Sequence, residues 1–128
     1  MARHYHVEIA AFVADADPKW VDNLLSRFDV PGVEAAKQGV ARRISATGIQ
    51  HISLVRRLTV DLSITADRAV ALAQELLATD GGRVQLSALL NLHLDQQRFR
   101  RETEHRLAHA VESIVLPRRG RPPARSIE

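Results

Sequence analysis

The sequence predicts a mainly α-helical fold with a small β component. Three observations predict it. Apolar residues recur at helical spacing in several segments, breaks rich in Gly, Pro and Asp separate those segments, and one late segment alternates with a period of two. The 128 residues fit one domain, and a hydrophobic content of 45% allows a core. Because the chain has only one Trp, one Tyr and three Phe, Ala, Leu, Val and Ile must form most of that core.

The first two helices are expected on either side of a short turn. Residues 4–14 show helical spacing of apolar residues, although residues 4–7 could also form a strand. Asp17 can cap a second helix, and Pro18 suits its first turn because the missing N–H costs nothing there. That helix should run to about Phe28 and bury three residues, namely Val21, Leu24 and Leu25.

A break at residues 29–32 precedes a segment with Gly39 near its centre. We expect residues 33–44 to form a short hairpin or loop, with a helical turn at residues 33–38 as the alternative. Ser45 or Thr47 can cap a third helix, and Thr65 can cap a fourth. Gly81 and Gly82 should end the fourth helix.

The alternating segment, residues 84–94, predicts a strand, although Leu89 interrupts the pattern. A last helix is expected over residues 95–115, with an apolar stripe that includes Phe99 and Leu107. A lone strand must pair its edge, so we expect residues 84–115 to form a homodimer. The alternative is that this segment packs back on its own domain. The predicted division is a domain at 1–80, a strand and dimerisation helix at 81–116, and a basic tail at 117–128.

The net charge of +3 is unevenly distributed. Residues 117–128 hold four Arg and one Glu, so residues 1–116 sum to zero. Residues 35–59 nevertheless contain five basic and no acidic side chains. Such a cluster is most often a solvated surface, so the motifs around it must indicate whether it binds a partner.

The spacing of residues 11–21 is that of a helix-turn-helix. Ala11 can be the small residue where two helices cross, and Val21 the apolar residue that fixes the crossing. Asp15 stands where the turn usually has Gly, and Asp tolerates the left-handed conformation better than most residues. With a hairpin at 33–44, the predicted architecture is a winged helix-turn-helix.

Three stretches resemble the DNA-binding domain of the MerR superfamily: VEIAAFVADADPKWVDNLLSRFDVPG, GVARRIS and GIQHISLVRRLTVDLSITADRAVALAQELL. The resemblance covers about residues 7–77, and Gly39, Arg42 and Arg43 match the family's wing. The family's aromatic pair is absent near Asn23, and Val40 and Ile44 replace the tyrosines of the wing. The resemblance is therefore to the fold and does not extend to the metal- or drug-sensing members.

The resemblance implies that double-stranded DNA is the partner. The helix at about 18–28 would enter the major groove, and the wing at about 33–44 would meet the backbone or minor groove. Trp20 could instead cover the core or pack on the sugar-phosphate backbone. Arg56 and Arg57 are adjacent, so at most one of them should face DNA. The tail sequence RGRP resembles an AT-hook, which would lie in the minor groove. The predicted DNA-binding residues are Lys19, Trp20, Asn23, Arg27, Lys37, Arg42, Arg43, Arg56, Arg119 and Arg121.

Other chemistry is disfavoured. Without cysteine there is no thiol catalysis or thiolate metal site. His105 and His109, or His4 and His6, could begin a zinc site, but surface polar residues explain them better. We expect no enzyme activity, metal or cofactor. No apolar run is long enough for a membrane span, and because the first residues lack a long apolar stretch we expect no signal peptide. We therefore expect a cytoplasmic, nucleoid-associated protein.

The leading interpretation is a sequence-specific DNA-binding protein, a dimeric transcriptional regulator. The alternative is a protein-interaction module on a MerR-like scaffold, of the chaperone-modulator type, that binds no DNA. The first predicts a continuous positive surface joining Lys19, Arg27, Lys37, Arg42 and Arg43. The second predicts an exposed apolar groove or an acidic patch.

Overall fold

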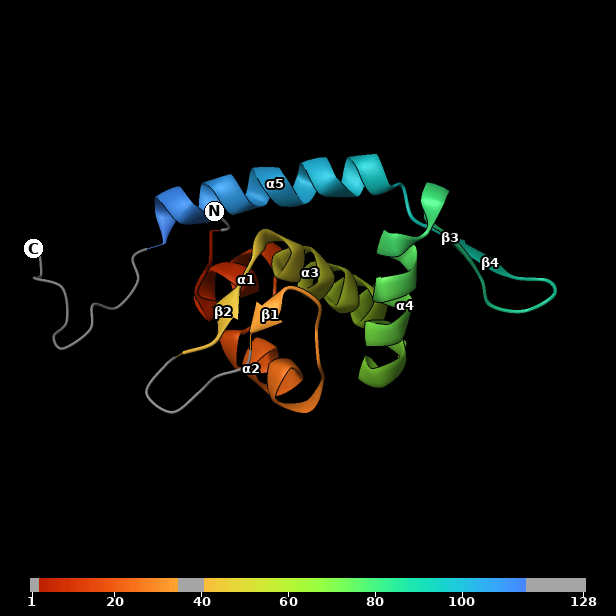
Figure 1. The fold of residues 1–128 in the computed structure, drawn as a ribbon, viewed down its shortest axis with the longest axis horizontal. Helices are drawn as coiled ribbons and strands as arrows, with labels where there is room; N and C mark the ends of the chain where they lie inside the picture. The colour runs from red at the N-terminus through yellow and green to blue at the C-terminus, as the bar shows by residue number, and fades with distance from the viewer. Residues whose placement is uncertain (1–2, 35–40, 115–128) are drawn as a thin grey trace, which may run out of the picture.

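The computed structural model describes residues 3–34 and 41–114. Helices dominate, and two short antiparallel hairpins supply the β component, which confirms the predicted fold class. The elements in chain order are α1 (Val7–Ala14), α2 (Pro18–Arg27), β1 (Val33–Glu34), β2 (Arg43–Ile44), α3 (Ala46–Asp61), α4 (Ala66–Ala78), the 3-10 turn η1 (Asp80–Gly82), β3 (Arg83–Gln85), β4 (Asn91–His93) and α5 (Gln96–Ser113). In Figure 1, α5 lies on one side of the molecule and α2 on the opposite side.

The turn between α1 and α2 has the predicted local chemistry. Asp15 adopts the left-handed conformation, with φ 57° and ψ 52°. The Ala16 N–H donates to the Ala11 carbonyl over 2.9 Å, which closes the end of α1. The Asp17 carboxylate accepts a 2.9 Å bond from the Lys19 N–H, and Pro18 occupies the first turn of α2. These four features turn the chain between α1 and α2 within three residues.

The hairpin of β1 and β2 follows α2. Val33 pairs with Ile44, and the Tyr5 N–H donates to the Ile44 carbonyl over 2.7 Å. The strand reading of residues 4–7 therefore applies to Tyr5 alone, because α1 begins at Val7. Between the two alternatives for the third cap, Ser45 is the residue that caps α3, and its hydroxyl accepts from the Gly48 N–H over 3.2 Å.

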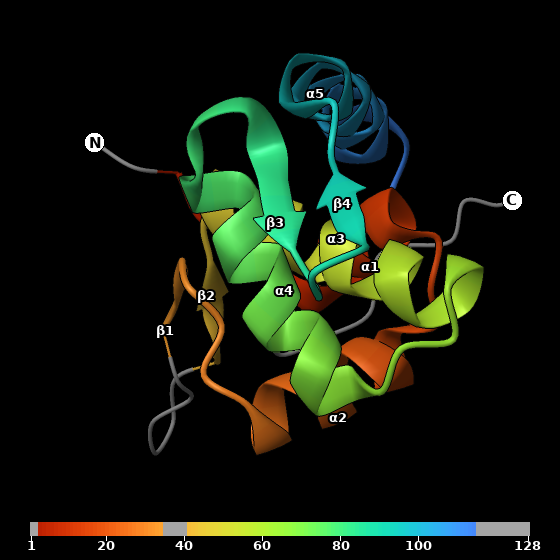
Figure 2. The same ribbon diagram turned by 90° about the vertical axis from the view of Figure 1, so that its right-hand side faces the viewer.

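The core lies where α1, α2, α3 and α4 meet, and it is aliphatic as predicted. Figure 2 looks nearly along α5 and shows α3 and α4 between α5 and α2. The largest fully buried side chains are Val21, Ile44, Ile49, Ile52, Val55 and Leu76. Because α2 contributes Val21 and Leu24 to this core, its polar side is left on the surface.

Residues 84–94 form a hairpin, and the single strand expected from their alternation is wrong. β3 and β4 pair through Val84 and Leu92, and the Leu86 N–H donates to the Leu90 carbonyl over 2.8 Å. A hairpin pairs one edge of each strand within the segment, whereas one extended strand would leave both of its edges unpaired. The turn exposes Leu89 and Leu90, which are 91% and 61% exposed.

α5 packs along α1 and α3 (Figure 1). Its buried residues are Phe99, Thr103 and Ala110, while Leu107 is half-buried against the core. The Gln96 amide joins the start of α5 to the end of α4 by donating to the carbonyls of Leu76 and Thr79, each over 2.7 Å. This inner face of α5 thus packs on its own domain. That packing is the alternative to dimerisation that the sequence left open.

Candidate nucleic-acid interface and an adjoining pocket

The outer face of α2 brings three predicted residues together. Lys19, Asn23 and Arg27 are exposed on the side opposite the buried Val21 and Leu24. The Arg27 guanidinium lies 5.0 Å from the centre of the Phe28 ring. α2 lies on the side of the molecule opposite α5, so the C-terminal helix does not cover it (Figure 1).

Arg42 connects the β1–β2 hairpin to α2. Its Nη1 lies 3.0 Å from the Asp22 carboxylate, and its Nη2 donates to the Ser26 hydroxyl over 2.8 Å. The sequence predicted Arg42 as a DNA contact, but these bonds commit its guanidinium within the protein. Arg43, one residue later, is exposed and stands opposite Glu34 in the strand register.

Trp20 and Arg56 contact each other. The Arg56 guanidinium lies 4.9 Å from the centre of the Trp20 ring, and both residues are half-buried. Trp20 therefore packs on α3 and partly covers the core, which is one of the roles that the sequence left open. Arg57 points elsewhere and forms a 2.6 Å ion pair with Glu102 on α5. As the helical geometry predicts, the two adjacent arginines face different partners.

The predicted positive surface is interrupted by acids. Lys19, Arg27 and Arg43 form no ion pair among the described residues, but Asp22 and Glu34 stand beside them. The pairing with Arg42 neutralises Asp22. Lys37, Arg119 and Arg121, together with Gly39 and Val40, lie outside the described residues, so their contribution stays a prediction.

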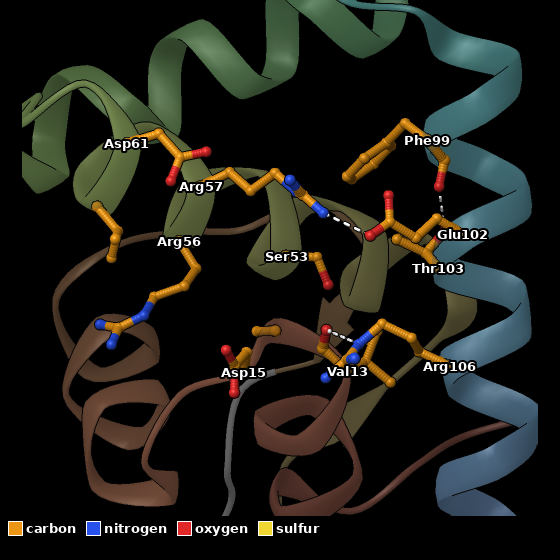
Figure 3. A pocket seen from close by; sticks show the side chains of 12 residues that line it. Val13, Asp15, Ser53, Arg56, Arg57, Asp61, Phe99, Glu102, Thr103 and Arg106 are labelled. Atoms are coloured by element: carbon orange, nitrogen blue, oxygen red, sulfur yellow. Dashed lines mark hydrogen bonds and ion pairs between the residues drawn. The ribbon is translucent and has the colours of Figure 1, made fainter.

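A pocket of about 400 Å³ lies between the end of α1, α3 and α5. Figure 3 shows the Ser53 hydroxyl pointing toward the place where Arg106 bonds to the Val13 carbonyl. Arg106 donates to the carbonyls of Val13 and Phe12, over 3.0 and 2.6 Å. Ser53 is not among the site residues predicted from the sequence. The available signal was a Ser between Ile52 and Leu54, two apolar residues of the predicted third helix.

The remaining polar candidates pack as ordinary surface residues. His109 lies against Phe12, with 5.5 Å between the ring centres. In the part of the chain that the structure describes, no three His, Asp or Glu side chains are grouped closely enough to hold a metal ion. Within the same residues, no helix combines the length and the hydrophobicity that crossing a bilayer requires.

Comparison with known proteins gives no relative. No protein-family model, no curated protein and no solved structure matches this chain. The resemblance to the MerR superfamily accordingly remains a prediction from the residues themselves.

Proposed function

We propose that this protein is a sequence-specific DNA-binding protein, a dimeric transcriptional regulator in which α1, α2 and the β1–β2 hairpin act as a winged helix-turn-helix. The observation that carries the proposal is the turn at Asp15, which sets α2 across α1 with its polar face outward. An α-helix presented in this way fits the width of the major groove.

Each exposed residue of the proposed interface has a chemical role. Asn23 can pair bidentately with adenine and Arg27 with guanine, so both would read bases. Lys19 and Arg43 would meet phosphates, which adds affinity without sequence preference. Arg42 would act indirectly, because its bonds to Asp22 and Ser26 hold the hairpin beside α2.

A second copy of the chain is proposed as the protein partner. The inner face of α5 is already packed, so the part of residues 84–115 best suited to pairing is the β3–β4 hairpin. Its strands pair only with each other among the described residues, and its turn exposes Leu89 and Leu90. Two domains related by a two-fold axis would read a pseudo-palindromic site. Sedimentation of the wild type against a Leu89→Ser, Leu90→Ser double variant tests this, since the wild type should be a dimer and the variant a monomer.

Selection of bound sequences from a random DNA pool tests the DNA-binding proposal. Gel shifts with the selected site at two salt concentrations then compare the variants. Asn23→Ala should relax the sequence preference, whereas Arg43→Ala should weaken all sites evenly and flatten the salt dependence. Arg101→Ala, which removes an exposed charge from α5, is the matched control and should change neither. Failure to bind any DNA at low salt would overturn the proposal.

The same experiment also tests the proposed role of the tail. Deletion of residues 117–128, which contain Arg119 and Arg121, should lower affinity and salt sensitivity and leave the selected sequence unchanged. A loss of sequence preference in the deleted chain would instead place the specific contacts in the tail.

One observation favours the alternative function, a protein-interaction module that binds no DNA. Glu34 on β1 stands opposite Arg43 in the strand register, and a carboxylate beside this cation repels phosphate. Under that alternative the wild type fails to shift DNA at low salt, while it still folds and melts cooperatively.

A further inference from the structure

The turn of the β3–β4 hairpin carries apolar side chains away from the body of the protein. Leu89 is 91% exposed and Leu90 is 61% exposed. In Figure 1 their turn, residues 86–90, projects beyond α4 and away from α1. The pairing of β3 with β4 holds the turn in this position. Two adjacent leucines at a projecting tip leave apolar surface in water, and burial against another molecule is favourable for such surface.

A pocket with apolar side chains in its lining lies on another part of the same chain. This pocket of about 400 Å³, between α1, α3 and α5, has the buried Val13 and Phe99 in its walls. Val60, near the end of α3, also lines it and is 58% exposed. Among the described residues, the exposed large apolar side chains are Leu89, Leu90, Val60 and Leu62. Three of these four therefore belong to the hairpin tip or to the pocket.

Most polar groups of the pocket already have partners within the fold. Arg57 and Glu102 form an ion pair, with 2.6 Å between Nη2 and Oε2. Arg106 donates to two carbonyls at the end of α1, and the Thr103 hydroxyl donates within α5. Covering paired polar groups costs less free energy than covering unpaired ones. The pocket is therefore better suited to apolar side chains than its charged residues alone would indicate.

The tip and the pocket also have complementary polar groups. The Ala88 N–H in the turn donates to no acceptor among the described residues. Asp15 and Asp61 lie on opposite sides of the pocket (Figure 3), and neither forms an ion pair among the same residues. Either carboxylate can accept a hydrogen bond from the backbone of an inserted turn, whereas an acidic segment would be repelled.

We infer that the hairpin tip of one copy inserts into this pocket of a second copy, with Leu89 and Leu90 packing on Val60 and the apolar lining. The inference rests on the proposed homodimer and names the surface that receives the hairpin. A tip and a pocket of the same chain do not meet, because the turn points away from α1, which forms one wall of the pocket (Figure 1).

A two-fold axis makes the exchange reciprocal, so that the contact occurs twice in each dimer. Each copy then contributes the 12 residues that line its pocket and the turn at residues 86–90. Together these residues approach the roughly 20–30 residues a side that a standard interface uses. The surface available is thus close to what a stable dimer needs.

Cross-linking between singly substituted chains tests the contact directly, because the chain has no cysteine. Ala88→Cys places a thiol at the tip and Asp61→Cys places one at the edge of the pocket, and both positions are exposed. An equal mixture of the two proteins, treated with a short bis-maleimide, should give a product that joins residue 88 of one chain to residue 61 of the other. Mass spectrometry of the digested product identifies the joined residues.

The matched control for this experiment is Asp29→Cys. It makes the same chemical change at an exposed residue that follows α2 and lies outside the pocket. Its mixture with Ala88→Cys should lose the cross-linked product under the same conditions.

Sedimentation equilibrium of further variants gives the dissociation constant of the dimer. Val60→Ser should raise it by about tenfold or more, because the change removes apolar surface from both contacts. Leu62→Ser is the matched control, since Leu62 is also exposed but does not line the pocket. It lies about 200° around the helix from Val60. Its dissociation constant should stay within about twofold of the wild type. Circular dichroism checks that each variant is folded.

Three results would overturn the inference. They are a wild-type chain that stays a monomer at every soluble concentration, no cross-link between residues 88 and 61, and a folded Val60→Ser variant that dimerises as tightly as Leu62→Ser. If the Leu89→Ser, Leu90→Ser variant is monomeric in either of the last two cases, the proposed dimer stands and only its receiving surface is wrong. The gel shifts measure DNA binding separately, so its failure is distinguishable from all three.

Discussion

Arg42 on β2 is bonded to Asp22 on α2, with 3.0 Å between Nη1 and Oδ1, and the pair holds the hairpin against the helix. The Arg42 side chain is 21% exposed, so water screens the pair only in part. Arg42→Ala should lower the free energy of unfolding by about 0.5–1 kcal/mol. Urea denaturation of the single variants and of Arg42→Ala with Asp22→Ala gives the coupling energy. Additive effects in this cycle would show that the bond contributes nothing to stability.

The left-handed conformation of Asp15 predicts an unusual order of substitutions. Asp15→Ala should destabilise by about 1 kcal/mol because Ala keeps the Cβ that is strained at positive φ and lacks the short polar side chain with which Asp and Asn offset that strain. Asp15→Gly and Asp15→Asn should stay within about 0.5 kcal/mol of the wild type, since both residues tolerate this conformation. Urea denaturation measures all three, and an Ala variant as stable as the Asn variant would contradict the prediction.

Gly32 is required for steric reasons beyond its positive φ of 84°. A Cβ at this position would meet the Gly48 backbone and lie 2.7 Å from the Ser45 Oγ. Gly32→Ala should therefore cost at least about 2 kcal/mol. Gly81 is the matched control, because its φ is 78° and a Cβ there meets nothing within 4 Å. Gly81→Ala should cost only about 1 kcal/mol by thermal or urea denaturation, and equal losses at both sites would rule out the steric explanation.

Ser53→Ala should stabilise the protein. The change removes an unpartnered buried hydroxyl and adds helix propensity, for a gain of about 1 kcal/mol in the free energy of unfolding. Ser26→Ala is the control on α2, where the hydroxyl bonds to the Asp22 carbonyl and to Arg42. It should give no such gain. A less stable Ser53→Ala variant would mean that the hydroxyl has a partner within the protein.

The Asp67 carboxyl should titrate at low pH in the folded chain. The Thr65 hydroxyl bonds to it, and backbone N–H groups and the Arg27 charge assist, so its pKa lies below the ordinary 3.8. Its stabilising effect is present above pH 3.8 and is lost as the pH falls through the lowered pKa. Titration followed by NMR should show the Asp67 pKa rising in Thr65→Val and remaining low in Thr65→Ser. An unchanged pKa in Thr65→Val would remove the hydroxyl as the main cause.

Local chemistry made part of this fold predictable. Asp17, Pro18 and Asp15 act through neighbours within a few residues, so the sequence alone located the turn and the start of α2. The alternation of residues 84–94 led to a wrong prediction, because a period of two residues fits the two strands of a hairpin as well as it fits one long strand. Only the bonds between Leu86 and Leu90 distinguish the two.

Most of the candidate sites could not be predicted without knowledge of tertiary contacts. The outward direction of Lys19, Asn23 and Arg27 followed from the apolar spacing of α2. The use of Arg42 within the protein depends on Asp22, twenty residues away, and no periodicity encodes that distance. Ser53 likewise lies beside a pocket only because α1 and α5 pack against α3.

The bond from Arg106 to the Val13 carbonyl has a consequence for how the protein is made. The two residues are 93 positions apart. The Val13 carbonyl therefore has no bond to Arg106 until most of the chain has been translated. At ordinary elongation rates that interval is roughly 5–20 s. Throughout it the surfaces of α1 and α3 that Phe99 and Ala110 later cover are bare. A nascent chain in this state offers apolar surface to chaperones and to other nascent chains, and ribosome stalling before α5 would prolong that exposure.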